Sequence, residues 1–522
     1  MDIGWPILEE NWNKDSYSWE KAIVKVAQMA NRNVFVKFFV HENIITKIGH
    51  ALYIDQPQLS ISPDVLRDPV ANERKLESLR TFIKKSAHLL ESNLSDETLK
   101  NEVEEMIEFE AKLVKAIPQR QPQMNFDSIL LKDLEERQKI KWNLIFKIAF
   151  GDANSKFNGS DPVFLRDNGY FDSLHDIIRS ANKRVIANYI GWHLVQALST
   201  YATKEFRDIV IEFQRIQVNL KNVSLYDECF DDILKVFNVV LGYSFLQDYD
   251  HRMTSETKNL IKLIKSSMSL AFQSNDWMDN ESKISAQSRL NQMSAQIAKP
   301  VWVPNENDVD KFYSKLSEIS PDNYCGNFIQ SNEWKRNIMF SEFYDPDIRW
   351  KWDFIKPKAT YNYNDNRLTF SPGILQPPFY FIDGLESTNF GVLGTIVAHE
   401  ITHGFDDADK FLNSTFDTDT PGMEQTRKFF SSKENCFIKQ YSNYKDPIKN
   451  ISVNGDMTLK ENIADNVGLN QAFMTYKLYK AMNEEKRVLT LPYQMQKFTD
   501  EQLFFISFGN HLCGKTRIHI PS

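Results

Sequence analysis

The first half of the chain carries apolar residues at the three- and four-residue spacing of amphipathic helices. Val103, Met106 and Ile107 are one example, within a helical pattern that runs from Trp19 to about Lys115. Further helices are predicted over residues 131–148, 173–178, 182–199 and 205–217, and two more over 255–297 with an interruption near 274–276. Alternating apolar positions at 34–40 and 50–55 predict short strands. This part of the chain is therefore expected to be mainly helical.

Beyond about residue 335 the pattern changes to short strands followed by a helix. Strands are predicted at 359–363 and 367–370 on either side of a turn, then a proline-rich stretch at 372–378, then a helix over 389–406. A chain of 522 residues is also too long for a single hydrophobic core. We therefore expect two parts, a mainly helical one over residues 1–335 and a mixed one over residues 336–522.

The candidate chemistry lies on the helix predicted over 389–406. His399 and His403 are four residues apart, so on a helix they project from one face, where two imidazoles can share one metal ion. Glu400 follows the first histidine and is placed to act as general base for a metal-bound water. A catalytic zinc usually takes three protein ligands, and two histidines with one glutamate form a known set. We therefore expect one Zn²⁺ per chain.

Glu461 is the expected third zinc ligand, and Asp465 lies four residues after it on the same helical face. From there the Asp465 carboxylate can hydrogen-bond the outer nitrogen of a ligand histidine and fix its tautomer. Two other interpretations are open. An H-E-x-x-H pattern also arises by chance on amphipathic helices, and Thr458-x-x-Glu461 has the form of a capping box, in which Glu461 bonds the helix start. The E-x-x-x-D pattern after H-E-x-x-H favours the zinc site.

These residues also carry a family resemblance. H-E-I-T-H-G-F-D-D at 399–407 and E-N-I-A-D-N at 461–466, preceded by S-P-G-I-L-Q-P-P-F-Y at 371–380, resemble the neprilysin and endothelin-converting-enzyme family of zinc metallopeptidases, which is of the gluzincin type. Weaker matches extend from Gly4-Trp5-Pro6 to Cys513-Gly514. The resemblance implies a mainly α, two-lobed fold, in which a large helical lobe covers a thermolysin-like α+β zinc catalytic lobe. It also implies hydrolysis of internal bonds in small peptides, with Asp406 and Asp465 supporting the ligand histidines.

Two departures from the family pattern bear on activity. The resemblance makes the strand at 359–363 the substrate cradle, with Ala359 and Tyr361 in contact with the peptide, but Lys358 stands where the family has an asparagine. A shift of register would leave the backbone of Ala359 binding as in the family. Family members also continue past Cys513-Gly514 to an oxyanion-stabilising histidine and a substrate-binding arginine, so the chain resembles a member truncated at both ends. The alternative function is therefore an impaired or inactive member that acts as a peptide-binding or interaction protein.

Composition limits the partners and the location. The net charge of −8 and the lack of a basic stripe argue against nucleic-acid binding. No apolar run reaches the roughly 20 residues of a membrane helix, and the first 30 residues have no signal-peptide core. Family members are membrane-anchored or secreted, so the resemblance implies an extracellular or plasma-membrane location. Six glycosylation sequons also favour an extracellular location: Asn93, Asn158, Asn222, Asn280, Asn413 and Asn450. The oligomeric state stays open.

The four cysteines allow two interpretations. By resemblance, Cys229, Cys436 and Cys513 fall at half-cystine positions of the family, with partners outside this chain, while Cys325 has no counterpart. Four reduced thiols are the alternative. The sequence leaves both open.

Overall fold

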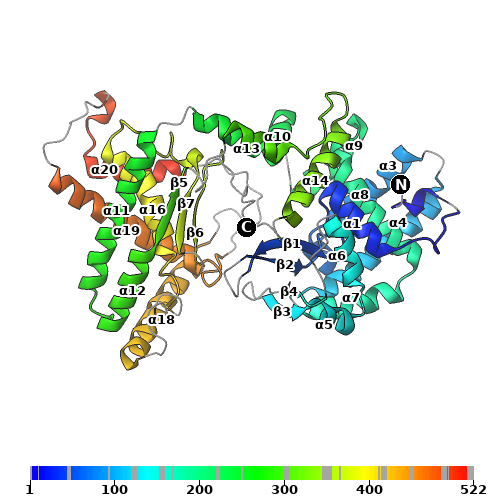
Figure 1. Cartoon of the computed structure of the whole chain (residues 1–522), viewed down its shortest axis with the longest axis horizontal. Coiled ribbons are helices and arrows are strands. Elements are labelled where there is room, and N and C mark those ends of the chain that lie inside the picture. The colour runs from blue at the N-terminus through cyan, green and yellow to red at the C-terminus, as the bar shows by residue number, and fades with distance from the viewer. Residues whose placement is uncertain are drawn as a thin grey trace. The chain divides into compact units, whose positions relative to one another are not determined.

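The computed structural model shows a mainly helical chain with two small sheets (Figure 1). It describes residues 3–9, 11–43, 49–91, 94–118, 126–151, 159–166, 168–218, 224–247, 251–298, 305–341, 343, 355–363, 366–408, 412, 420–445, 452–483, 491 and 493–513. The expected mainly α fold is confirmed. No helix within these ranges is both long enough and apolar enough to span a bilayer.

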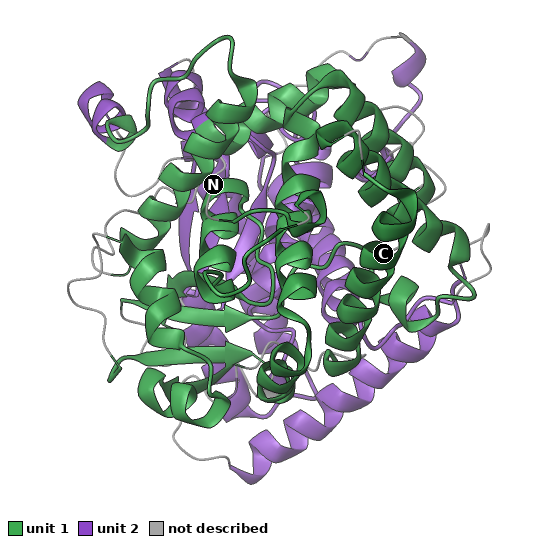
Figure 2. Ribbon diagram, turned by 90° about the vertical axis from the view of Figure 1, so that its right-hand side faces the viewer, with its two compact units in different colours: residues 1–236, 312–350, 521 green, residues 237–311, 351–520, 522 purple. Residues whose placement is uncertain are grey.

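The chain forms two compact units that are not continuous in sequence (Figure 2). The first comprises residues 1–236 and 312–350 with residue 521, and the second comprises 237–311 and 351–520 with residue 522. A single boundary near residue 335 was expected from the sequence. The segment 237–311 instead packs with the second unit, because its apolar residues Leu260, Ile264 and Leu290 share a core with Leu393 and Val397.

The first unit surrounds a four-stranded sheet with helices. Its strands are β1 (Lys37–Glu42), β2 (His50–Asp55), β3 (Phe126–Leu130) and β4 (Pro162–Arg166), in the order β1-β2-β4-β3, with β2 and β4 parallel and the other neighbours antiparallel. Its helices are α1 (Trp19–Ala30), α2 (Pro63–Arg67), α3 (Glu73–Leu90), α4 (Asp96–Ala116), α5 (Leu131–Gln138), α6 (Trp142–Phe150), α7 (Asn168–Ser180), α8 (Lys183–Leu198), α9 (Lys204–Val218) and α14 (Tyr324–Ser341), with short turns η1 (Pro6–Leu8) and η3 (Ser199–Tyr201). Helices α10 (Leu225–Gln247) and α13 (Glu306–Tyr313) run across the unit boundaries.

The first unit confirms the strands expected near 34–40 and 50–55, but it divides one expected helix. The predicted helix at 131–148 is two helices, α5 and α6, because Lys139 adopts a left-handed backbone with φ of 54° and ends α5. Strands β3 and β4 were not expected. They pair with each other, and β4 pairs with β2 across more than a hundred residues of sequence, so local periodicity gives no sign of them.

The second unit combines a three-stranded sheet with long helices. Strands β5 (Ser294–Ile297), β6 (Ala359–Asn362) and β7 (Arg367–Phe370) lie in the order β5-β7-β6, with β6 antiparallel and β5 parallel to β7. The helices are α11 (His251–Ser274), α12 (Asn280–Gln292), α15 (Glu386–Asn389), α16 (Thr395–Thr402), α18 (Pro421–Ser442), α19 (Leu459–Met482) and α20 (Asp500–His511), with short turns η4 (Pro372–Ile374) and η6 (Tyr493–Met495) and a π-helical turn η5 (Phe390–Gly394) between α15 and α16.

One helical prediction in this unit is wrong. Residues 294–297 were expected to continue the helix before them, but Met293 has ψ of 115° and the chain enters strand β5. Ser294 pairs with Arg367 and Ile297 with Phe370, so the strand is created by a partner far along the chain. Strands at 359–362 and 367–370 are as expected, and the predicted helix at 389–406 begins earlier, at Glu386, and ends at Thr402.

Candidate metal centre

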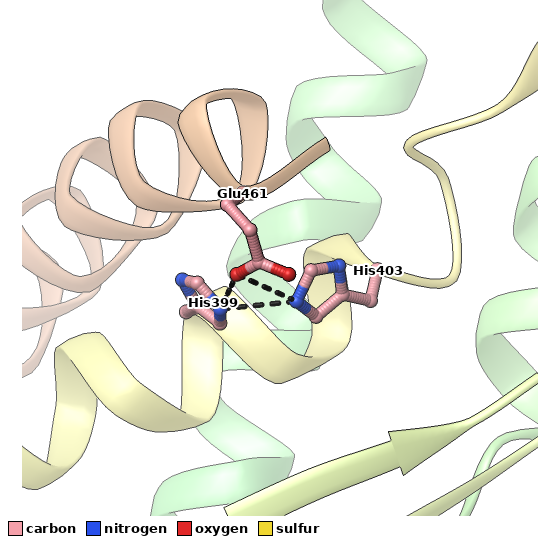
Figure 3. A group of neighbouring side chains, drawn as sticks. All are labelled: His399, His403 and Glu461. Carbon is pink, nitrogen blue, oxygen red and sulfur yellow. Dashed lines mark hydrogen bonds and ion pairs between the residues drawn. The ribbon is translucent and has the colours of Figure 1, made fainter. Parts of the chain in front are cut away.

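Two helices of the second unit bring the expected zinc ligands together. His399 projects from α16, His403 is the residue that caps the C-terminus of this helix, and Glu461 reaches both from the first turn of α19 (Figure 3). The helices approach closely because α19 has a glycine, Gly468, at the contact. A Cβ atom there would lie 2.7 Å from the backbone nitrogen of His399 and 2.9 Å from its Cα. Only a residue without a side chain therefore allows this approach of α19 to α16.

The three side chains have the separations that a tetrahedral zinc site needs. The Nε2 atoms of His399 and His403 are 3.0 Å apart, and Glu461 Oε2 lies 3.4 Å from the first and 3.7 Å from the second. Ligands at about 2.1 Å from a tetrahedral zinc ion are roughly 3.4 Å from one another. Within the described ranges, His399, His403 and Glu461 form the one group of three or more histidine, cysteine or acidic side chains with metal-binding spacing. The residues present therefore fit the ion.

Carboxylates hold the other nitrogen of each histidine. Asp465 Oδ1 lies 2.9 Å from Nδ1 of His399, and Asp406 Oδ2 lies 2.9 Å from Nδ1 of His403. A carboxylate at Nδ1 favours the tautomer that carries its proton there, which leaves Nε2 free to bind a metal. Burial lowers the pKa of His399, but the hydrogen bond to Asp465 and the neighbouring carboxylates raise it more, so its pKa lies above the ordinary value.

The position of Asp406 follows from how α16 ends. The backbone N–H of Gly404 donates to the Ile401 carbonyl oxygen at 3.0 Å, and that of Phe405 donates to the Thr402 carbonyl oxygen at 2.8 Å, so the chain tightens into three-residue turns. This turn places the buried Asp406 three residues after His403 and beside its ring. The sequence proposed Asp406 as a supporting carboxylate without indicating which histidine it would meet.

The alternative capping box of Thr458 and Glu461 is not formed. The side chain of Thr458, the N-cap of α19, makes no capping hydrogen bond and donates instead to the Asn454 carbonyl oxygen at 3.1 Å. The Glu461 carboxylate lies against the two histidines (Figure 3). An adjacent ion pair, Lys460 Nζ to Asp407 Oδ2 at 3.1 Å, joins the start of α19 to the segment that follows α16.

Glu400 is buried beside the cluster and is held by strand β6. The backbone N–H of Tyr361 donates a hydrogen bond to its carboxylate. Burial raises the pKa of Glu400, while the two histidines and the bond from Tyr361 oppose the rise, and its pKa stays above the ordinary value. The carboxylate is thus oriented and partly desolvated.

A cavity of about 460 Å³ opens beside His399 and Glu400. Ala359 of β6 borders it, and apolar side chains form much of its wall: Ile374, Ile396, Leu469, Phe508 and Leu512. Polar groups of Tyr441, Asn466 and His511 also line it. Among the residues that the structure describes, strand β6 pairs with β7 along one edge and with no strand along the other, which faces α16 and the cavity.

Arg289 on α12 is a residue of this site that sequence reasoning missed. Its buried guanidinium donates from Nε to the Gly404 carbonyl oxygen at 3.0 Å and from Nη2 to the Tyr361 hydroxyl at 2.8 Å. It therefore joins the end of α16 to strand β6. A signal was present, since Arg289 shares the buried face of α12 with Ser282, Ser285 and Ala286 at helical spacing, an unusual place for an arginine.

Other predicted features have simpler outcomes. The four cysteines, all within the described ranges, form no disulfide with one another. Of the six sequons, Asn280 is described and is exposed at the start of α12, while the other five asparagines lie outside the described residues. Histidines 41, 50, 88, 175, 193 and 251 join no metal-binding group within the part of the chain that the structure describes.

Comparison with known proteins agrees with this geometry. Two models of the family described as Peptidase family M13 match the chain, one over residues 2–300 and one over residues 358–519. Neprilysin-1 of Trittame loki is 27% identical over an alignment of 535 residues that covers 98% of this chain and 73% of that protein. The endothelin-converting enzyme homolog of Locusta migratoria is 27% identical over 525 residues, covering 98% of this chain and 71% of that protein.

Solved structures show the same fold. The zinc metalloprotease Zmp1 of Mycobacterium tuberculosis, in complex with an inhibitor, superposes with a TM-score of 0.79 at 20% identity over 97% of this chain and 75% of that one. Since the two family models match in chain order and the second spans the cluster of His399, His403 and Glu461, the chain belongs to peptidase family M13 and is a zinc metalloendopeptidase.

Proposed function

We propose that the chain hydrolyses internal bonds of small peptides, with Glu400 as the general base. His399, His403 and Glu461 are the residues that would hold zinc. When bound there, a zinc ion supplies a Lewis acid that polarises the scissile carbonyl and acidifies a water. The family membership supports the reaction class, and the converging donor atoms support the ligand set.

The observation that carries the proposal is the setting of the Glu400 carboxylate. It is buried, is next in sequence to a ligand histidine, and is oriented by the backbone N–H of Tyr361. Glu400 takes a proton from the attacking water and later gives it to the leaving amine. A carboxyl group whose pKa is raised by burial is suited to hold that proton between the two transfers.

Asp465 and Asp406 act as positioning residues in this proposal. Each holds the outer nitrogen of one histidine at 2.9 Å, which fixes the ring orientation and keeps the inner nitrogen unprotonated. Neither carboxylate touches the reacting bond. Their contribution is to the binding of the metal and to the geometry of its ligands.

Strand β6 is the proposed substrate cradle. An extended peptide can add to an open strand edge through main-chain hydrogen bonds. Ala359 borders the cavity and offers its peptide groups at that edge, while the corresponding N–H of Tyr361 is already bonded to Glu400. In this proposal Ala359 contacts the substrate directly, and Tyr361 contributes by holding the general base.

The proposal includes an extracellular or membrane-associated location, with which the exposed sequon at Asn280 is compatible.

The test is cleavage of an internally quenched fluorescent peptide by the purified full chain, with zinc content measured on the same sample. Wild type is expected to bind about one zinc per chain and to cleave the peptide. Glu400→Gln should retain zinc and lose at least roughly 10²-fold in kcat, because it removes the base and leaves the ligands. Zinc and peptide binding without cleavage would support the non-catalytic interaction protein instead. A folded protein without zinc would refute the ligand assignment.

A further inference from the structure

Lys358 stands immediately before the cradle strand, and its main chain is fixed. Its backbone N–H donates to Ser371 Oγ at 2.9 Å, and its carbonyl oxygen accepts from the backbone N–H of Ser371 at 2.9 Å. The buried Ser371 hydroxyl also donates to the Lys356 carbonyl oxygen at 2.7 Å. One serine therefore anchors the entry into β6, so the position of Lys358 relative to the strand is set by the fold.

The ladder between β6 and β7 shows which way the strand's peptide groups point. In an antiparallel pair, successive residues bond alternately to the partner strand and away from it. Lys358 bonds to Ser371, so Ala359 and Tyr361, which face Phe370 and Leu368, direct their peptide groups away from β7. The bond from Tyr361 N–H to Glu400 agrees with this alternation. The open edge therefore runs from Glu400 past Ala359 toward Lys358.

Spacing along the strand relates Lys358 to the reacting bond. A strand advances about 3.3 Å per residue, so Lys358 lies roughly 10 Å along β6 from Tyr361. A peptide extended along this edge, with its scissile bond beside Glu400, reaches Lys358 two or three residues from that bond. Ala359 and the cavity lie between these two points.

Lys358 is a cation without an opposing carboxylate among the described residues. Its side chain is exposed, and no salt bridge or side-chain hydrogen bond ties it to an acid there. A negative group on a bound peptide is the natural partner of such a site, because the lysine gives up no ion pair with a described acid to reach it.

We propose that Lys358 is a specificity-determining residue that selects peptides carrying a carboxylate two or three residues from the scissile bond. The carboxylate is that of an acidic side chain or of the peptide's own C-terminus. This inference rests on the proposed peptidase function and adds the substrate class. Because the lysine is solvent-exposed, the selection is modest, about 1.5-fold to fivefold, and it weakens as salt is added.

The experiment separates binding from cleavage. Fluorescent peptides of one sequence carry Glu or Gln at the second or third position from the cut, and a further pair ends there in a free carboxylate or an amide. Binding is measured by anisotropy to zinc-loaded Glu400→Gln protein, and kcat/KM is measured for protein with Glu400 intact. In both the Glu400→Gln protein and the protein with Glu400 intact, three versions are compared: one that keeps Lys358, one with Lys358→Met, and one with the control substitution Lys428→Met. Lys428 is an exposed lysine of α18 that pairs with Glu424 and is absent from the cavity wall.

Protein with Lys358 is expected to favour the carboxylate peptide of each pair by about 1.5-fold to fivefold in Kd and KM. Lys358→Met should abolish the preference with little change in kcat, and Lys428→Met should keep it. The side-chain and C-terminal pairs show which carboxylate is selected. Cleavage with a preference that survives Lys358→Met would overturn this proposal alone. A Lys358-dependent binding preference without cleavage would overturn the peptidase mechanism alone, and equal binding of all peptides would overturn the selection.

Discussion

The contact between α16 and α19 predicts that Gly468→Ala weakens the metal site without touching a ligand. The added Cβ would lie 2.7 Å from the His399 nitrogen, 2.9 Å from its Cα and 3.2 Å from the Ala398 carbonyl carbon. All three are backbone atoms and cannot rotate away. Since ordinary carbon contacts begin near 3.4 Å, the helices must move apart by about 0.7 Å at this point.

That displacement acts on the hydrogen bond that orients His399. Asp465 lies one turn before Gly468 on α19 and is 2.9 Å from His399 Nδ1, so a shift of about 0.7 Å brings the pair to the limit of a hydrogen bond. Loss of such an outer contact typically lowers metal affinity about 10- to 100-fold. The overpacking costs about 1–3 kcal/mol in unfolding free energy, against which the better helix propensity of alanine restores about 1 kcal/mol.

The assay measures zinc affinity by competition with a chelator, and stability by denaturant unfolding of the zinc-free protein. Gly509→Ala is the matched control, because Gly509 lies in α20 and a Cβ atom added there would meet no atom within 4 Å. The control should keep zinc affinity and gain up to about 1 kcal/mol. If Gly468→Ala also keeps wild-type zinc affinity and gains stability as the control does, the close contact is not what positions His399.

Two further predictions concern buried polar groups. Glu110, in the core of the first unit, has a pKa raised by burial from 4.5 to about 7, so its stabilising contribution is complete below pH 4.5 and is lost as pH rises through 7. The loss amounts to about 3 kcal/mol of unfolding free energy. Glu110→Gln keeps an acceptor for Ser60 N–H and the Tyr189 hydroxyl, and it should remove this part of the pH dependence in denaturant titrations. An unchanged pH profile would contradict the raised pKa of Glu110. Arg289→Met should lower the unfolding free energy by about 2–3 kcal/mol and reduce kcat/KM, because the arginine joins α16 to β6. Arg289→Lys should recover part of both losses. Equal kcat/KM in the wild type and the two variants would contradict this role of Arg289.

The site residues were accessible from sequence to different degrees. His399 and His403 could be paired because helical spacing alone puts positions four apart on one face. Glu461 depended on a second motif, and its competing role as a capping residue could be judged only from where its carboxylate lies. Arg289 could not be placed, because its partners, the Gly404 carbonyl and the Tyr361 hydroxyl, come from segments more than 70 residues away.

The sequence by itself determined the helical character of most segments and the nature of the chemistry. Periodicity of apolar residues is a local property, and so is the four-residue spacing of two metal-binding side chains. Tertiary structure alone decided that residues 237–311 join the second unit, that residues 294–297 form a strand, and that Gly468 brings α19 onto His399. These features depend on pairing and close packing between distant segments, whose energies are set by the partner and not by the local sequence.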